Sequence, residues 1–319
     1  MSDASIGIGT DVKGAAHDAA VLDAGARVAD YVALLKPRVM SLVVFSGFAG
    51  LMLAPGSIHP ILGAVAVLCI AVAAGAAGAI NMWYDRDIDA VMRRTCARPI
   101  PTGKVKAEEA LAFGVVLSVC SVMLMGLALN WAAAALLAIA NLFYVFVYTI
   151  WLKRRTPQNI VIGGAAGAFP PMIGWTAVTG NVGLASIALF ALIFMWTPLH
   201  FWALALFRRG DYEKAGVPML PVVAGDRATK LQMLLYTAIL LPLGLAPYWL
   251  GISGILYAAA ALALGLTFLG FAVWVWFDET ERAAKRMFAY SILYLFLMFA
   301  AMMVDRSPGL LPRLVEWVG

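Results

Sequence analysis

The amino-acid sequence predicts an all-α, polytopic membrane protein with nine transmembrane helices. Of its 319 residues, 63% are hydrophobic and only 13% are charged, and the mean hydropathy is +0.88. Soluble domains contain about 25% charged residues, so this chain has too little polar material to cover a water-exposed surface. The other two observations are a series of nine apolar runs of spanning length and the confinement of charge to the connections between them.

The nine apolar runs follow one another from residue 38 almost to the C-terminus. They fall at 38–55, 60–82, 109–129, 131–151, 159–179, 184–206, 230–250, 253–276 and 286–304. Pro37 and Pro60 stand at helix starts, where a missing N–H costs nothing, and Pro170-Pro171 predict a break or kink within the fifth helix. Residues 1–35 contain no apolar segment and are predicted to be a disordered cytoplasmic tail, which leaves 36–319 as one membrane domain.

The distribution of basic residues predicts the orientation. The connections after helices 1, 3, 5 and 7 contain no Lys or Arg. Those after helices 2, 4, 6 and 8, together with the N-terminal tail, hold every basic residue except Arg306 and Arg313. The positive-inside rule therefore places the N-terminus and these four connections in the cytoplasm and the C-terminus across the membrane. It also accounts for the net charge of +5, so we expect the lipid bilayer as a partner and no nucleic acid.

Two of these connections, after helices 2 and 6, are much longer than the rest and lie four helices apart. This spacing hints at an internal duplication of four helices followed by a ninth, and repeat halves in membrane proteins often meet at the binding site. The three cysteines show neither disulfide nor metal-ligand spacing, and no Walker loop, zinc motif or nucleophile elbow is present.

An acidic motif ends the second apolar run. Asn81, Asp85 and Asp89 are spaced i, i+4, i+8, so they share one face of a helix. Two like charges one turn apart repel each other, whereas Mg²⁺ commonly binds one or two carboxylates together with the phosphates of a substrate. We therefore predict a metal–diphosphate site at a membrane surface. Asp87 falls off this face and is expected to be solvated or paired with Arg86.

Two arginines downstream of this motif are candidate phosphate ligands. Arg94 and Arg98 are also spaced i, i+4, so they share a face if the helix persists that far. A guanidinium group binds phosphate oxygens bidentately and stays charged. The alternative is that they are topogenic charges, which is the interpretation we favour for Arg93. Gln158 and Asn159 lie at the cytoplasmic edge of the fifth helix. We expect them to face the same cavity as Asp85.

The second long connection begins with a histidine-containing segment. His200 is the only histidine within a predicted span, and an ionisable residue there is a functional candidate. It is suited to coordinating a metalloporphyrin, orienting a water or acting as a general base, although a histidine hydrogen-bonded within the bundle would give the same pattern. Asp211 and Glu213 either supply a second metal contact or balance Arg208 and Arg209.

Together these residues resemble the UbiA superfamily of intramembrane prenyltransferases. Its signature, Asn-x-x-x-Asp-x-x-x-Asp, is matched by Asn81, Asp85 and Asp89. Four further segments resemble the branch that farnesylates haem: Arg94-Thr-x-x-Arg98-Pro, Thr156-Pro-Gln-Asn-Ile-Val-Ile-Gly-Gly, His200-Phe-Trp-Ala-Leu-Ala and Asp211-Tyr-x-x-Ala-Gly-Val-Pro-Met-Leu-Pro. The resemblance runs from about Lys36 to the C-terminus.

The resemblance implies nine helices around a central cavity, with Mg²⁺ and a prenyl diphosphate at its cytoplasmic mouth. It implies transfer of the farnesyl group of farnesyl diphosphate to a vinyl group of haem b, with addition of water, giving haem O and diphosphate in a bacterial inner membrane. Asp85 and Asp89 would hold Mg²⁺, the Arg94 and Arg98 side chains would hold diphosphate, and haem b would be a substrate. Association with haem A synthase or oxidase assembly factors is left open.

One departure from the superfamily pattern bears on the acceptor. A second Asp-x-x-x-Asp motif is expected after helix 6, but its counterpart here is Arg208-Arg-Gly-Asp211-Tyr212, with a basic residue at one acidic position. This argues against a second metal site of the usual kind and favours phosphate contacts by Arg208. Two alternatives are a superfamily enzyme with an aromatic, quinone-pathway acceptor and a secondary transporter. A transporter would place ionisable groups near the bilayer midplane, whereas the carboxylates here cluster at one face.

Overall fold

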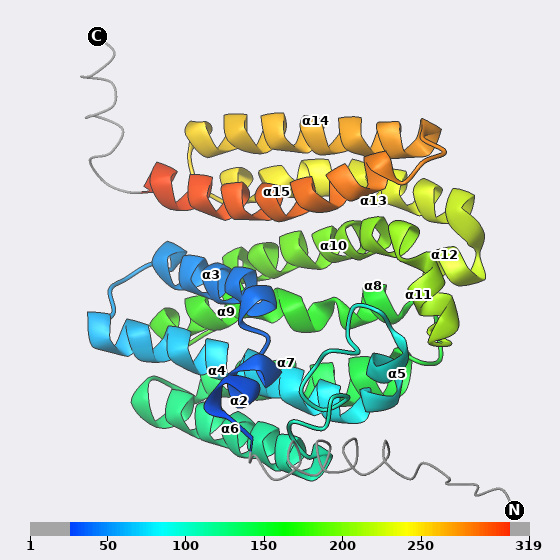
Figure 1. Ribbon diagram of the computed structural model, residues 1–319. Helices are drawn as coiled ribbons and strands as arrows, with labels where there is room; N and C mark the ends of the chain where they lie inside the picture. Colours follow the sequence, from blue (N-terminus) through cyan, green and yellow to red (C-terminus); the bar gives the residue numbers. More distant parts are fainter. Residues whose placement is uncertain (1–25, 307–319) are drawn as a thin grey trace, which may run out of the picture.

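Helical spans run back and forth across the molecule (Figure 1). The computed structural model describes residues 26–306, and helix is the only regular secondary structure in that range. The long elements are α3 (Pro37–Leu53), α4 (Pro60–Tyr84), α6 (Ala107–Ala128), α7 with η1 (Trp131–Leu142 and Phe143–Leu152), α8 with α9 (Asn159–Gly163 and Ala165–Thr179), α10 (Leu184–Phe207), α13 (Gly225–Trp249), α14 (Ile255–Phe277) and α15 (Arg282–Arg306).

The short elements are α2 (Val28–Leu34), α5 (Arg86–Val91), α11 (Arg209–Lys214) and α12 (Leu220–Val223). Within residues 26–306, eight spans are long and apolar enough to cross a bilayer, and the pair α2 and α3, bent by 56°, gives a ninth when it is counted as one span. The prediction of an all-α, multi-pass membrane protein is confirmed. In Figure 1, α5, α8, α11 and α12 gather at one end of the bundle, where the long basic connections are.

Helices α3 and α9 pack with their backbones almost in contact. A Cβ atom added at Gly174 would lie 2.0 Å from the carbonyl oxygen of Gly47, and one added at Gly50 would lie 2.0 Å from that of Pro171. Since lipid tails are as apolar as the helices, close packing of small residues replaces the hydrophobic effect as a source of helix association.

The segment predicted to be a disordered tail contains a helix, so the boundary at residue 35 is wrong. Helix α2 occupies Val28–Leu34, and Leu34 is fully buried against Ala79 and Met82 of α4. The helix is too short and too polar to give a spanning signal, and the contact that buries Leu34 is not visible in the local sequence. Residues 1–25 lie outside the described residues.

Two spans differ from the prediction, which expected a continuous α-helix for the fourth and a break or kink at Pro170-Pro171 in the fifth. The fifth is interrupted at Gly164, and α9 continues through Pro170 and Pro171, so the break is not at the prolines. At Gly164, an added Cβ would lie 2.8 Å from a methyl group of Thr197, which shows how closely α10 approaches there. The fourth span, α7 with η1, changes from α-helix to a ten-residue π-helix at Phe143. Apolar content does not distinguish π- from α-helix, and π-helices are frequent at functional sites.

Candidate functional site

Asn81, Asp85 and Asp89 lie on one continuous helical face, although α4 ends at Tyr84 and the helix resumes at Arg86 as α5. The backbone N–H of Asp85 donates to the Asn81 carbonyl at 2.9 Å and that of Asp89 donates to the Asp85 carbonyl at 2.8 Å, which preserves the i→i+4 path. The three residues are only 4%, 0% and 2% exposed. The Asn81 amide donates to the Asp85 carboxylate at 2.7 Å. Two carboxylates are thus buried one turn apart.

The buried carboxylate of Asp85 is neutralised by the end of η1. Lys153 forms an ion pair with Asp85, and the Arg154 guanidinium lies 3.5 Å from its second oxygen. The Asn81 amide also donates to the Thr149 hydroxyl at 3.2 Å. Because a buried charge is stable only when it is paired, these contacts fix the end of η1 against the end of α4.

Lys36 completes this group of charges from the other side. It lies at the bend between α2 and α3, where its φ of 51° is the one left-handed non-glycine conformation in residues 26–306. Its ammonium group donates to the Asn81 side-chain oxygen at 2.9 Å. Sequence reasoning assigned Lys36, Lys153 and Arg154 to membrane topology and missed these contacts, because pairing between distant helices leaves no local pattern.

Of the two predicted phosphate arginines, only Arg98 is bonded to the acidic motif. Its guanidinium lies 2.6 Å from the Asp89 carboxylate, and the Thr95 hydroxyl donates to the Asp89 carbonyl at 3.0 Å. Helix α5 ends at Val91, so the condition for Arg94 and Arg98 to share a helical face is not met. Arg94 is exposed and forms no ion pair within the described range.

Asp87 is largely exposed to solvent, which was one of the two predicted alternatives, but its ion pair is with Arg154 and not with Arg86. Arg154 binds its two carboxylate oxygens at 2.6 and 2.7 Å, and this hydrogen bonding lowers the pKa of Asp87 to about 2. Arg86 instead donates to the carbonyl oxygen of Trp83 at 2.8 Å. The correction follows from the fold, because Arg154 is brought close only when η1 packs against α4.

The two polar residues predicted at the start of the fifth helix separate in the structure. Gln158 is exposed, whereas Asn159 is fully buried and donates from its amide to the Thr156 carbonyl at 2.6 Å. The side-chain oxygen of Asn159 has no hydrogen-bond partner in the described part of the chain. Asn159 therefore retains a free acceptor, and Gln158 is directed to the surface.

His200 lies in the seam between α10 and α15, apart from the carboxylates. Its ring stacks between Trp196 and Phe288, with ring centroids 4.7 and 4.6 Å away. Its Nδ1 atom is 2.7 Å from the hydroxyl of Ser291, and that hydroxyl donates its only proton to the Phe288 carbonyl, also at 2.7 Å. With the Ser291 proton on that carbonyl, Nδ1 of the neutral ring carries the hydrogen and Nε2 is an acceptor.

The other predicted residues of the second connection do not reach the acidic motif directly. Arg208 is exposed, with its guanidinium 5.7 Å from the centre of the Phe207 ring, and Asp211 forms no ion pair within residues 26–306. Glu213 balances Arg209 at 2.8 Å. The two long connections nevertheless pack together through an apolar cluster: Ile88, Met92, Ile160, Ala205, Tyr212, Val217 and Met219.

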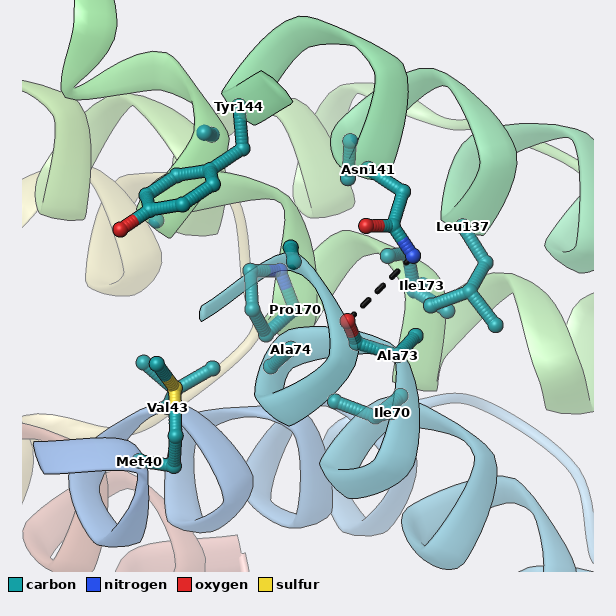
Figure 2. A pocket seen from close by; sticks show the side chains of 14 residues that line it. Met40, Val43, Ile70, Ala73, Ala74, Leu137, Asn141, Tyr144, Pro170 and Ile173 are labelled. Carbon is teal, nitrogen blue, oxygen red and sulfur yellow. Dashed lines mark hydrogen bonds between the residues drawn. The ribbon is translucent and has the colours of Figure 1, made fainter. Parts of the chain in front are cut away.

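A cavity of about 100 Å³ lies inside the bundle, beside the part of α4 that precedes the acidic motif. Figure 2 shows the side chains that line it. Ile70, Ala74 and Ala77 line it and follow the same face of α4 as Asn81, in steps of three or four residues. Helix α3 closes a second side, α7 with η1 a third and α9 a fourth. The lining is apolar except for Asn141 and Tyr144. The carboxylates therefore lie above a mainly apolar cavity.

The donor set fits a hard divalent cation such as Mg²⁺ that is shared with a substrate. In the described range no three His, Cys, Asp or Glu side chains come together, so the chain offers no all-protein metal cage. Two buried carboxylates on one face are what Mg²⁺ uses when phosphate oxygens and water complete its octahedral shell.

Comparisons with known proteins place the chain in a family. The model of the UbiA prenyltransferase family matches residues 43–302. Two curated relatives, from Parvibaculum lavamentivorans and Acidiphilium cryptum, are each 60% identical and are both named protoheme IX farnesyltransferase. The alignments cover 88% and 91% of this chain, and 90% and 96% of the relatives.

Solved structures show the same fold. The chain superimposes on a digeranylgeranylglyceryl phosphate synthase with a TM-score of 0.73 at 19% identity, covering 87% of this chain and 98% of that one. It superimposes on a UbiA homologue from Archaeoglobus fulgidus bound to DMAPP and Mg²⁺ with a TM-score of 0.66 at 18% identity, covering 85% and 99%. With its acidic motif buried at the end of α4, the chain belongs to the UbiA prenyltransferase family.

Proposed function

We propose that this protein transfers the farnesyl group of farnesyl diphosphate to a vinyl group of haem b, with addition of water, giving haem O and diphosphate. The observation that carries the proposal is the position of two buried carboxylates and four bonded cations above an apolar cavity. That arrangement suits a substrate with an anionic head and a long apolar tail. The acceptor is supported by the names of the curated relatives.

The charged groups around the acidic motif are suited to bind diphosphate. Lys36, Arg98, Lys153 and Arg154 are bonded to the motif, against the three carboxylates of Asp85, Asp87 and Asp89. This leaves an excess of positive charge in a largely buried place, where electrostatic interactions are stronger than in water. In this structure the cations neutralise the carboxylates. If Asp85 and Asp89 held a metal ion, these cations would be free to contact phosphate oxygens.

Asp85 and Asp89 would hold Mg²⁺, and the ion would bridge the chain to the diphosphate and stabilise the negative charge that develops on it. The basic side chains add preorganised donors for the same charge. The apolar cavity below would hold the farnesyl chain and keep bulk water away from the allylic cation. We place Arg94, Arg208 and Asp211 at the mouth, where the two connections meet.

His200 is proposed to act on the acceptor. Its bond to Ser291 leaves Nε2 free as an acceptor, which is the form needed either to bind a haem iron or to hold a water. The aromatic rings around it supply flat apolar surfaces suited to a porphyrin. We propose that Asn159 and Gln158, at the start of the fifth span, also contact the substrate at this mouth. We also propose a bacterial inner-membrane location, with the basic connections in the cytoplasm.

The test is incubation of purified protein with haem b, farnesyl diphosphate and Mg²⁺, followed by mass spectrometry. Haem O and released diphosphate are expected, and chelation of Mg²⁺ should abolish both. Asp85→Asn and Asp89→Asn should each lower the rate by about a hundredfold or more while the protein still inserts. Near-normal haem O from both variants would overturn the metal assignment. A prenylated aromatic acid in place of farnesylated haem would favour a quinone-pathway acceptor.

A further inference from the structure

Ser291 of α15 holds two neighbouring side chains of α10. It is fully buried, and its hydroxyl oxygen lies 2.7 Å from Nδ1 of His200. Its backbone carbonyl accepts a hydrogen bond from the indole nitrogen of Trp196 at 2.8 Å. Trp196 and His200 lie one turn apart on the same face of α10, and their rings stack. A single residue of α15 therefore fixes both members of an aromatic pair that belongs to another helix.

The hydroxyl group of Ser291 selects the tautomer of His200. Its proton is directed at the Phe288 carbonyl, 2.7 Å away, so its oxygen is left to accept a hydrogen bond from Nδ1. The opposite tautomer would put the N–H on Nε2, which has no acceptor among residues 26–306. An N–H group without a partner inside a protein is rare, because it loses its hydrogen bond to water. Ser291 thus favours the neutral ring with its lone pair on Nε2.

The side chains around His200 leave Nε2 open to a ligand. Trp196 and Phe288 cover the two faces of the ring, inclined by 20° and 27° to its plane, and Ser291 covers the Nδ1 edge. His200 is nevertheless only half-buried, and Nε2 is not one of the fully buried unpaired atoms in the described part of the chain. Its lone pair lies in the plane of the ring, so the stacked rings do not obstruct it. A ligand can therefore approach Nε2 along that plane.

An imidazole held in this way has the properties of an iron ligand. A histidine that binds a metal through one nitrogen almost always donates from the other to an oxygen atom, which fixes the ring and raises its basicity. A porphyrin bound through its iron at Nε2 lies perpendicular to the imidazole. The rings of Trp196 and Phe288, nearly parallel to the imidazole, would then meet the porphyrin edge to face, an arrangement that aromatic groups favour. A water at Nε2 would gain nothing from these two rings.

We propose that Ser291 is a positioning residue, which holds His200 in the tautomer and orientation that bind the iron of the haem acceptor through Nε2. The inference rests on the proposed function, because it takes haem b as the acceptor. Ligation of the iron fixes the plane of the porphyrin and with it the vinyl group on the porphyrin rim, which reduces the entropy lost when the vinyl group meets the farnesyl cation. Ser291 does not touch the substrate and acts only through His200.

The position of His200 is compatible with a reaction at the acidic motif. Phe201, the next residue along α10, meets the imidazole edge to face, with ring centroids 5.2 Å apart. Phe201 also packs against the apolar cluster that contains Ile88, and Ile88 directly precedes Asp89 in α5. The histidine and the acidic motif thus border the same cluster. Because the vinyl groups are at the porphyrin rim, iron bound at His200 leaves the reacting carbon free to meet the farnesyl group.

The variant Ser291→Ala tests the inference, because it removes the hydroxyl with little change in volume. With reduced haem b bound, resonance Raman spectra of the wild-type protein should show an iron–histidine stretch that His200→Ala lacks. In Ser291→Ala the stretch should weaken and move to lower frequency, since Nδ1–H has lost its acceptor. The KM for haem b should rise about tenfold or more, the usual effect of losing such a partner. The KM for farnesyl diphosphate should not change, because the acidic motif is intact.

Ser121→Ala is the matched control. Ser121 of α6 is 3% exposed, and its hydroxyl donates to the Ser118 carbonyl at 2.9 Å, the same kind of bond that Ser291 makes to Phe288. It forms no hydrogen bond to a histidine in the described range. The control should leave the iron–histidine stretch and both KM values at their wild-type levels.

Two outcomes would overturn the inference. One is a wild-type protein that makes haem O but shows no iron–histidine stretch, a result that does not depend on any variant. The other is a stretch and a KM for haem b that are the same in Ser291→Ala as in the wild type. A stretch that depends on Ser291, in a protein that makes no farnesylated haem, would support the inference and overturn the proposed reaction instead.

Discussion

At the scale of single residues, the candidate site is a set of charges that neutralise one another in a place where water is scarce. Asp85 is fully buried and is held by Lys153, and Asp89 is held by Arg98. Breaking such a pair leaves an uncompensated charge, which is costlier than the pair itself is stabilising. The same residues therefore matter for both folding and binding, and substitutions need measurements that separate the two.

Lys153→Met should weaken binding of the diphosphate more than it slows the chemical step. The variant keeps the length of the side chain but removes its charge, and a hydrogen bond to a charged group contributes about 1.5–3 kcal/mol. We expect the KM for farnesyl diphosphate to rise about tenfold or more, measured in steady-state assays on folded protein. Arg155→Met is the matched control, because Arg155 is exposed and forms no ion pair in the described range. Equal effects of the two substitutions would contradict the assignment.

The Asp87–Arg154 pair should contribute stability only above acidic pH. The pKa of Asp87 falls from about 3.9 in the unfolded chain to about 2 in the fold, so the stabilisation is present above about pH 4 and is lost as the pH falls toward 2. Asp87 is 63% exposed, so solvent screening limits the contribution to below about 1 kcal/mol. Asp87→Asn should therefore flatten the pH dependence of the unfolding midpoint in that window. An unchanged profile would show that the pair does not persist in solution.

At the scale of elements, helix ends and helix contacts decide where the chemistry is placed. The π-helical segment η1 brings Thr149 and Lys153 to the end of α4, and the interruption at Gly164 separates α8 from α9 beside Thr197 of α10. The contact between α3 and α9 depends on glycines, because any side chain there would overlap a backbone atom. Glycines of α3 and α9 thus pack the helices, while the ends of α4 and η1 hold the charges.

Gly174→Ala should destabilise the bundle. Its new methyl group would lie 2.0 Å from the Gly47 carbonyl oxygen, and overpacking of this kind typically costs about 1–3 kcal/mol. We expect a lower midpoint of thermal unfolding in detergent or nanodiscs. Gly270→Ala in α14 is the control, because its methyl group meets nothing within 4 Å and alanine favours a helix. If both variants unfold at the wild-type temperature, α3 and α9 are not in backbone contact.

At the scale of the whole molecule, the bundle places all its long basic connections at one end (Figure 1). The first and second long connections meet there through Ile88, Met92 and Tyr212, while His200 and Ser291 join α10 to α15 deeper in the fold. The predicted internal duplication remains a prediction. A diphosphate binding at this end would contact residues contributed by spans far apart in the sequence.

The orientation prediction can be tested with the native cysteines. Cys96 is exposed in the first long connection, whereas Cys69 is buried and Cys120, although exposed, lies within the span α6, where lipid would surround it. A membrane-impermeant maleimide should label the protein in inside-out vesicles and leave it unlabelled in right-side-out vesicles. A variant with Cys96→Ser and Val182→Cys should show the reverse pattern, because Val182 is exposed in the connection between α9 and α10. Labelling of Cys96 from the outside would invert the topology.

The sequence by itself determined the class of fold, eight of the nine predicted spans and the acidic motif. These follow from properties read along the chain: a bilayer requires long apolar runs, charge accumulates outside them, and a helix brings every fourth residue to one face. Only the tertiary structure decided which charges pair with Asp85 and Asp89, that Arg154 and not Arg86 binds Asp87, and that Asn141 faces a cavity. Each of these depends on contacts between helices, and a contact between distant segments leaves no periodic trace in the sequence.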